Sequence, residues 1–153
     1  LGLGASMGAA ALISAASDDS PEGQAISAVA VYDTFDDLPS LAHSVAVSRF
    51  VPPLSWVADR FGLALASFQT GADLENFRPS RCIAQLWPRP VMVIHAQDDL
   101  IIPFQHGQAL FDAASEPKRQ LWVGGGHNQV LNDESVAREV RDFFDEARAV
   151  PAI

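Results

Sequence analysis

The sequence predicts an α/β fold built on a parallel β-sheet, and two observations indicate it. Short apolar runs at 26–32, 90–95 and 120–123 alternate with segments of helical spacing. The run from Pro90 to His95 is apolar almost throughout, which is typical of a parallel strand covered by helices on both faces. Alternating strands and helices with right-handed crossovers set successive strands parallel in one sheet.

The first third of the chain predicts strand, sharp turn, helix and strand. Leu1 to Gly4 is expected to end a buried strand, and Met7 to Ser17 is rich in Ala, as in a helix packed tightly on a sheet. Turn-forming residues fill Ser17 to Gly23. The apolar, partly β-branched run Ile26 to Tyr32 then predicts a second buried strand.

The rest of the chain predicts a helical insertion followed by two further strands. Between Asp36 and Trp87 helical spacing is broken by prolines, so we expect several short helices that form a cap-like insertion over a site. After the strand at 90–95, helical spacing returns from Phe104 to Ala114, and Gln120 to Val123 predicts a last short strand. Asn132 to Ala149 predicts an amphipathic helix, whose apolar stripe is Val136, Val140, Phe143 and Phe144.

Length and composition favour one globular domain that does not bind nucleic acid. The 153 residues suffice for a single core, and 48% of them are hydrophobic against 19% charged. Ten Lys and Arg against nineteen Asp and Glu give a net charge of −9, which repels phosphate backbones and anionic membranes. We therefore expect neither nucleic acid nor a membrane as a partner of this segment. The sequence leaves the oligomeric state open.

Cysteine content and hydropathy favour a cytoplasmic protein. Cys82 is the single cysteine, so an internal disulfide is excluded and no oxidising compartment is needed. No apolar run reaches the roughly 20 residues that span a bilayer, and the chain begins without a signal pattern. Because Leu1 already belongs to a strand that enters a sharp turn, we expect amino-terminal strands to precede this segment in a longer protein. Those residues are a possible source of a signal or an anchor.

The segment Gly4-Ala5-Ser6-Met7-Gly8 matches the pattern Gly-x-Ser-x-Gly. In this pattern a serine occupies a strained turn between a strand and a helix, and the flanking glycines let neighbouring backbone approach closely. The spacing alone has little specificity, but a strand end precedes it here and an Ala-rich helix follows. We therefore expect Ser6 to be a nucleophile; the alternative is a Gly/Ser-rich loop that merely opens a helix.

A nucleophilic serine needs a base to take its proton and an acid to orient that base. Asp98 and Asp99 follow the strand at 90–95, and His127 follows the last strand after three glycines. The carboxyl ends of parallel strands are where sites collect. The order Ser, Asp, His along the chain is also the order of the nucleophile-elbow hydrolases.

With these motifs in order, the chain resembles the carboxyl-terminal half of an α/β-hydrolase, close to small serine aminopeptidase-like and prolyl oligopeptidase-like hydrolases. Their pattern Ile-His-Gly-x-x-Asp-x-x-Val-Pro, laid on Ile94 to Pro103, places the acid on Asp99 and leaves Asp98 as the alternative. Ala96 stands where the family usually has Gly. Ala113 to Lys118 and Gly124 to His127 resemble the family's Ala-rich helix end and its Gly-x-Gly-His.

The resemblance implies a serine hydrolase that cleaves the carboxylic ester bond of a small acyl substrate. It implies no metal or other cofactor. Ser6 is the expected nucleophile, His127 the general base and Asp99 the orienting acid, while the backbone N–H of Met7 supplies one oxyanion donor. The family's Gly-rich loop, which carries the second donor, has no counterpart here. Alternatives within the fold are a peptidase or thioesterase, a non-catalytic binding module and an inactive fragment.

The other histidines and the aromatic residues favour structural roles. His95 is expected to pack at a strand end with one hydrogen bond. His43 and His106 lie on predicted helices without an acid or cysteine at ligand spacing, so we expect neither to bind a metal. Helical spacing of Trp56, Phe61 and Phe68 favours core positions, with the lining of an acyl pocket as the alternative.

Overall fold

The computed structural model describes residues 1–52, 54–129 and 133–149, which form two compact units. The larger unit comprises Leu1–Asp36 and Pro79–Ile153, and the smaller unit is Asp37–Arg78. The smaller unit falls inside the segment 36–87, for which the sequence predicts a cap-like insertion. Its role as a cap stays a prediction.

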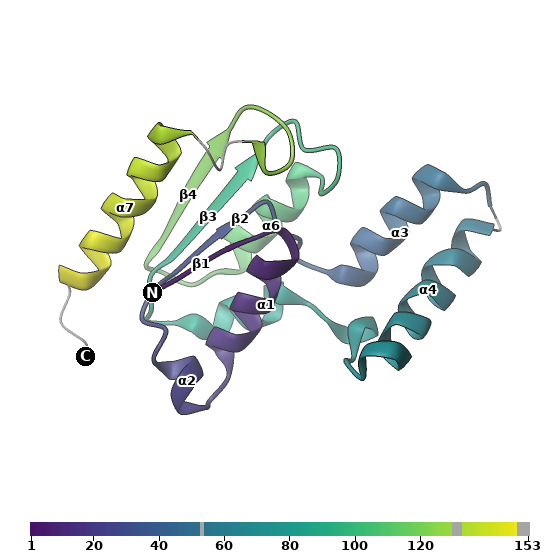
Figure 1. Ribbon diagram of the computed structural model, residues 1–153, viewed down its shortest axis with the longest axis horizontal. Coiled ribbons are helices and arrows are strands. Elements are labelled where there is room, and N and C mark those ends of the chain that lie inside the picture. Colours follow the sequence, from purple (N-terminus) through teal and green to yellow (C-terminus); the bar gives the residue numbers. More distant parts are fainter. Residues whose placement is uncertain (53, 130–132, 150–153) are drawn as a thin grey trace. The chain divides into compact units, whose positions relative to one another are not determined.

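The larger unit is built on a parallel sheet of four described strands in the order β1-β2-β3-β4 (Figure 1). The strands are β1 (Gly2–Ala5), β2 (Val29–Tyr32), β3 (Val91–Ala96) and β4 (Lys118–Val123). Each strand pairs with the next one along the chain, so all four carboxyl ends meet at one edge of the sheet. The predicted parallel α/β sheet is confirmed.

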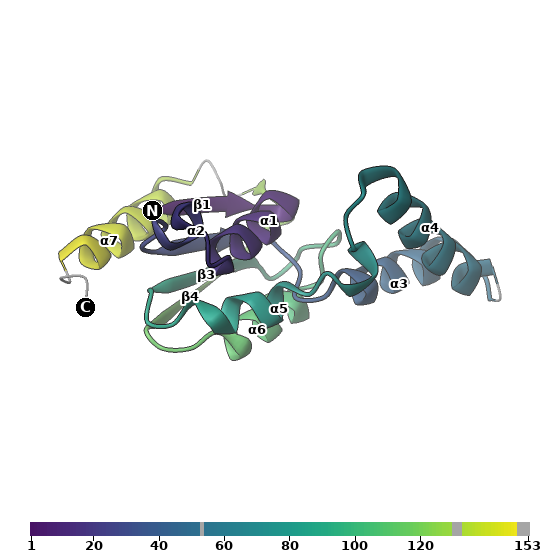
Figure 2. The same cartoon turned by 90° about the horizontal axis from the view of Figure 1, so that it is seen from below.

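Helices cover both faces of this sheet, because alternate residues of the strands point to opposite sides (Figure 2). On one face Val29, Val31, Val91 and Val93 pack with residues of α1 (Ser6–Ser17), α5 (Pro79–Ile83) and α6 (Phe104–Ala113). On the other face Ala30, Tyr32, Met92 and Ile94 pack with Val136, Val140 and Phe143 of α7 (Glu134–Ala149). The predicted apolar stripe of the last helix thus packs into the core on this face of the sheet.

Local hydrogen bonds shift two element boundaries from their predicted places. Ser20 caps the short helix α2 (Pro21–Gln24) by accepting from the N–H of Gly23, where the sequence indicates only a turn. The N–H of Ile26 donates to the carbonyl of Gly23, so residue 26 still belongs to the turn that follows α2. β2 therefore begins at Val29 rather than at residue 26. β4 begins two residues before its predicted start because Lys118 pairs with Val91 of β3.

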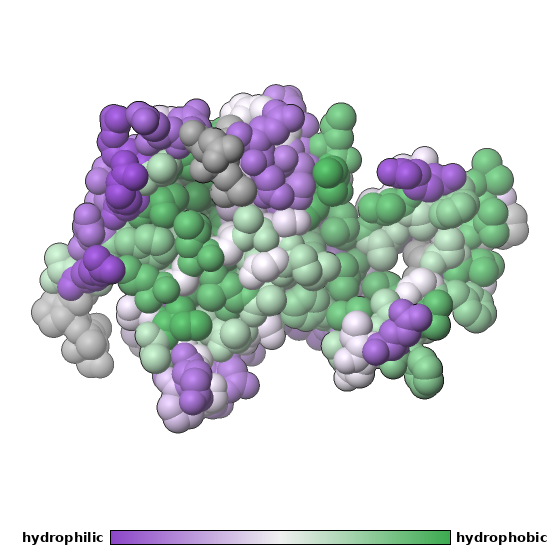
Figure 3. All heavy atoms as spheres, viewed as in Figure 1, coloured by the Kyte–Doolittle hydropathy of each residue, from purple (hydrophilic) through white to green (hydrophobic). Residues whose placement is uncertain are grey.

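The smaller unit is a pair of helices, α3 (Leu38–Arg49) and α4 (Leu54–Thr70), followed by the 3₁₀ turn η1 (Leu74–Asn76). Asp37 caps α3 by accepting from the N–H of Ser40. The space-filling view shows hydrophobic surface over these helices (Figure 3). Trp56, Phe61 and Phe68 are 60%, 70% and 87% exposed. The core interpretation of these aromatics is therefore wrong.

A second 3₁₀ turn, η2 (Ala84–Leu86), leads from α5 towards β3 in the larger unit. No helix in the described part of the chain is long and apolar enough to cross a membrane.

Candidate active site

Ser6 lies at the tight connection between β1 and α1. Its backbone has φ of 50°, in the left-handed region that residues with a Cβ rarely adopt. A Cβ on Gly4 would lie 2.7 Å from the Cα of Ala9, so only glycine lets the strand pass this close to the helix. A non-glycine residue held in this region costs on the order of 1–3 kcal/mol and is typical of functional sites. The predicted strained turn is present.

The carboxylate of Asp99 is fixed by the loop that follows β3. Its Oδ1 accepts from the backbone N–H groups of Ile101 and Ile102, at 2.8 and 2.9 Å. Its Oδ2 lies 2.6 Å from Nδ1 of His127, and the side chain is fully buried. Because Oδ1 is occupied by two donors, Oδ2 is the oxygen left for the imidazole.

His127 bridges the acid and the serine from the loop after β4. Its Nε2 lies 3.1 Å from the Ser6 Oγ, while Nδ1 faces Asp99. Gly125, two residues before it, has φ of 99°, a conformation that only glycine adopts easily. The imidazole side chain is 12% exposed, so little water reaches the hydrogen bonds on either side of it.

The structure thus brings together the three side chains singled out from the sequence, each from the carboxyl end of a different strand. The alternative acid, Asp98, does not face His127. Its carboxylate is exposed and its Oδ2 accepts from the N–H of Gly125 at 3.3 Å. The backbone N–H of Met7 is in the first turn of α1, where Ala5 at the N-cap supplies no side-chain hydrogen bond.

Comparisons with known proteins agree with this architecture. No protein-family model matches the chain. It is 50% identical over 42 residues to α/β hydrolase domain-containing protein 17B of Homo sapiens, a match that spans 27% of this chain and 15% of that protein. It is 38% identical over 63 residues to α/β hydrolase domain-containing protein aho-3 of Caenorhabditis elegans, across 40% of this chain and 19% of that protein.

Solved structures extend the likeness to nearly the whole chain. The α/β hydrolase GrgF from Penicillium sp. sh18 superposes with a TM-score of 0.66 at 16% identity, over 97% of this chain and 63% of that one. An esterase domain from Rhodothermus marinus gives 0.61 at 21% identity, over 95% and 58%. The chain has the α/β-hydrolase fold. It spans less than two thirds of the length of either of these structures.

In this chain of α/β-hydrolase fold, His95 supports the loop that carries Asp99. Its ring is completely buried on β3, and Nε2 lies 3.0 Å from the carbonyl oxygen of Ile102. A Cβ on Gly107 of α6 would meet the ring at 2.6 Å, so that glycine makes room for it. The expected strand-end role with one hydrogen bond is what the structure shows. Nδ1 has no hydrogen-bond partner among the described residues.

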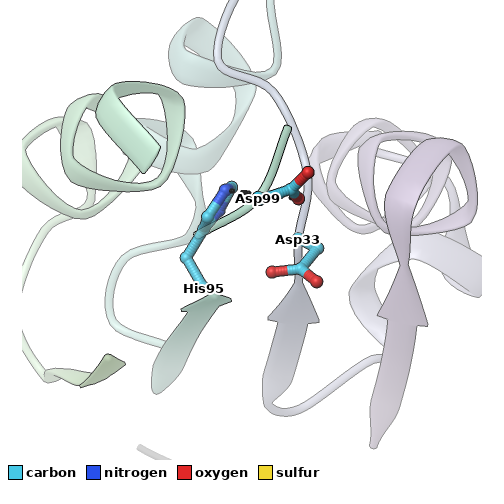
Figure 4. Close-up of side chains that lie close together, drawn as sticks. All are labelled: Asp33, His95 and Asp99. Carbon is cyan, nitrogen blue, oxygen red and sulfur yellow. Dashed lines mark ion pairs between the residues drawn. The ribbon is translucent and has the colours of Figure 1, made fainter. Parts of the chain in front are cut away.

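Sequence analysis missed Asp33, which directly follows β2 at the same edge of the sheet. Figure 4 shows it with His95 and Asp99 at the ends of two neighbouring strands, where their ligand-type atoms lie within 4.8 Å of one another. Such a set can in principle hold a metal ion. Both carboxylates, however, already accept backbone N–H groups, and His95 faces a carbonyl oxygen. A cation would have to displace these bonds, so we assign no metal site here.

For His106 the structure adds a contact that the sequence does not show, and the expectation that it binds no metal stays a prediction. This histidine of α6 has an acidic partner, because its Nδ1 lies 2.5 Å from Oδ1 of Asp36. The two residues are 70 positions apart, so their spacing in the sequence gives no sign of the pair. His43 lies on α3, as predicted.

Proposed function

We propose that this chain carries the catalytic residues of a serine hydrolase that cleaves a carboxylic ester through an acyl-enzyme. The observation that supports the proposal most strongly is the continuous hydrogen-bonded series from Ser6 through His127 to Asp99. A base within hydrogen-bond reach of a hydroxyl, itself oriented by a third group, is the arrangement that activates a serine. The fold shared with esterases favours an ester as the substrate.

In the first half of the reaction, Ser6 Oγ attacks the ester carbonyl carbon while His127 Nε2 takes its proton. Asp99 holds the proton on Nδ1 and stabilises the imidazolium that forms. The carbonyl oxygen becomes an oxyanion, which the N–H of Met7 at the amino end of α1 is placed to bind. The helix dipole favours negative charge at that end.

The second half returns the serine to its starting state. His127 gives its proton to the departing alcohol as the carbon–oxygen bond breaks, which leaves the acyl group on Ser6. A water molecule then attacks the acyl carbon, and His127 takes its proton as general base. As this second tetrahedral intermediate collapses, the bond between the acyl carbon and Ser6 Oγ breaks, His127 returns the proton to Oγ, and the carboxylic acid is released.

Ser6→Ala tests the assignment in the full-length gene product that contains this chain. A fluorophosphonate probe is expected to label the wild-type protein at Ser6, as read by mass spectrometry of the labelled peptide. Ser6→Ala should abolish the labelling and ester hydrolysis, while Ser14→Ala, a serine of the same helix, should keep both. Labelling at another serine, or hydrolysis retained by a folded Ser6→Ala variant, would refute the proposal.

A further inference from the structure

The feature that the proposed chemistry leaves unused is the buried carboxylate of Asp33. The residue is completely buried and has φ of 43°, which is rare for a side chain with a Cβ. Its Oδ1 accepts from the N–H of Ala96 and its Oδ2 from the N–H of Asn128, each at 2.7 Å. Both oxygens thus accept from backbone N–H groups, at distances near the short end of the usual range for hydrogen bonds to a carboxylate.

These two bonds join the segments that carry two members of the triad. Ala96 is the last residue of β3 and lies three positions before Asp99. Asn128 directly follows His127. The bonds span 63 and 95 residues of sequence, so one side chain that follows β2 connects the end of β3 with the loop after β4.

The bond to Asn128 acts on the backbone of His127 itself. The N–H of Asn128 and the carbonyl of His127 belong to one planar peptide group, so fixing the direction of the N–H fixes that plane. Asn128 also has φ of 58°, which places a second unusual conformation immediately after the histidine. The described contacts include no other hydrogen bond to this peptide group. Loss of the bond to Asp33 would therefore leave its orientation without a hydrogen bond to fix it.

Burial of a carboxylate is unfavourable unless it is paired or hydrogen-bonded. Asp33 takes part in none of the ion pairs between described residues. Its hydrogen-bond partners are backbone N–H groups. A purely apolar side chain would fill the same space at a lower cost of desolvation but would leave the N–H groups of Ala96 and Asn128 without this acceptor.

We propose that Asp33 is a positioning residue of the proposed hydrolase, which sets the His127 imidazole between Asp99 and Ser6 by holding the N–H of Asn128. The inference rests on the function proposed above. Asp33 contacts neither the substrate nor the reacting atoms in this scheme; it acts on the backbone that carries the base.

Asp33→Asn tests the proposal with a side chain of the same size. The amide oxygen accepts only on one side, and the NH₂ group faces the other backbone N–H, donor against donor. Because a displacement of about 1 Å from productive geometry costs on the order of 100-fold in rate, we expect kcat for a p-nitrophenyl ester to fall about 100-fold with KM little changed. The far-downfield NMR resonance of the His127 Nδ1 proton should weaken or disappear.

Asp98→Asn is the matched control. Asp98 also accepts a backbone N–H of the histidine loop, that of Gly125, but it is exposed and its bond is longer, at 3.3 Å. This variant should keep wild-type kcat and the downfield resonance. A folded Asp33→Asn protein with wild-type kcat and an unchanged resonance would overturn the proposal, since a role in stability alone lowers only the unfolding midpoint.

If Asp33→Asn does not fold, an amide-to-ester replacement at residue 128 removes only the N–H that Asp33 holds. The control is the same replacement at Gln129, whose N–H donates to the Gly126 carbonyl at 3.1 Å. We expect the loss of kcat and of the resonance only for the ester at 128, and wild-type behaviour there would again overturn the proposal. Absence of hydrolysis in the wild type would refute the proposed function instead, while the resonance still reports on the positioning.

Discussion

Replacing Asp99 with asparagine is expected to reverse the tautomer of His127. Oδ1 of Asp99 accepts two backbone N–H groups, at 2.8 and 2.9 Å, so the amide oxygen of the variant must occupy that place. The NH₂ group then replaces Oδ2, which lies 2.6 Å from Nδ1 of His127. Nδ1 becomes an acceptor and the proton moves to Nε2, which faces Ser6 and therefore no longer takes the serine proton.

The expected loss follows from this change of tautomer. The corresponding substitution in a serine protease triad lowers kcat about 10⁴-fold, which corresponds to about 5.5 kcal/mol of transition-state stabilisation at roughly 1.4 kcal/mol per factor of ten. Initial rates with a p-nitrophenyl ester measure it, and circular dichroism confirms the fold. A folded Asp99→Asn protein whose kcat is within tenfold of the wild-type kcat would refute the assignment of Asp99 as the acid. A large loss in Asp98→Asn instead would move the acid by one position.

Two further substitutions test the supports of the site, and a third tests the pH dependence of stability. Gly4→Ala places a Cβ 2.7 Å from helix backbone and should lower stability by roughly 1–3 kcal/mol and abolish probe labelling. The control is Gly8→Ala, whose Cβ meets no atom within 4 Å; it should not lower stability and should keep the labelling. Gly107→Ala drives a Cβ to 2.6 Å from the His95 ring and should lower both the unfolding midpoint and kcat. Asp133→Ala tests pH dependence, because hydrogen bonds from Ser135 hold the pKa of Asp133 below its ordinary value. Its stabilisation is present above the pKa of unfolded Asp, about 3.9, and is lost as the pH falls through the folded pKa. The difference in urea midpoint from wild type should therefore vanish in acid.

The parts of the fold that the sequence predicts are those encoded by local patterns. The run at 90–95 is apolar at nearly every position because β3 is covered on both faces, and the last helix shows its buried stripe at helical spacing. The elbow at Ser6 is predictable for the same reason, since strand, glycines and Ala-rich helix follow one another directly. Asp99 and His127 are found because each follows a strand in the order that the resemblance requires.

What the sequence does not show depends on contacts between distant residues. The role of Asp33 rests on donors 63 and 95 positions away, and those donors are backbone groups that every residue except proline carries. The partner of His106 is 70 positions away. The exposure of Trp56 and Phe68 is likewise a property that helical spacing does not encode.

The bond between His127 and Ser6 joins residues 121 positions apart, which has a consequence for the protein during its synthesis. The serine leaves the ribosome first, and at about 5–20 residues per second its base follows roughly 6–24 s later. Throughout that interval Ser6 lacks His127, the base of the proposed mechanism. Under the proposed function, a nascent chain that has already formed its first strand and helix therefore has no base for Ser6 until the last loop closes.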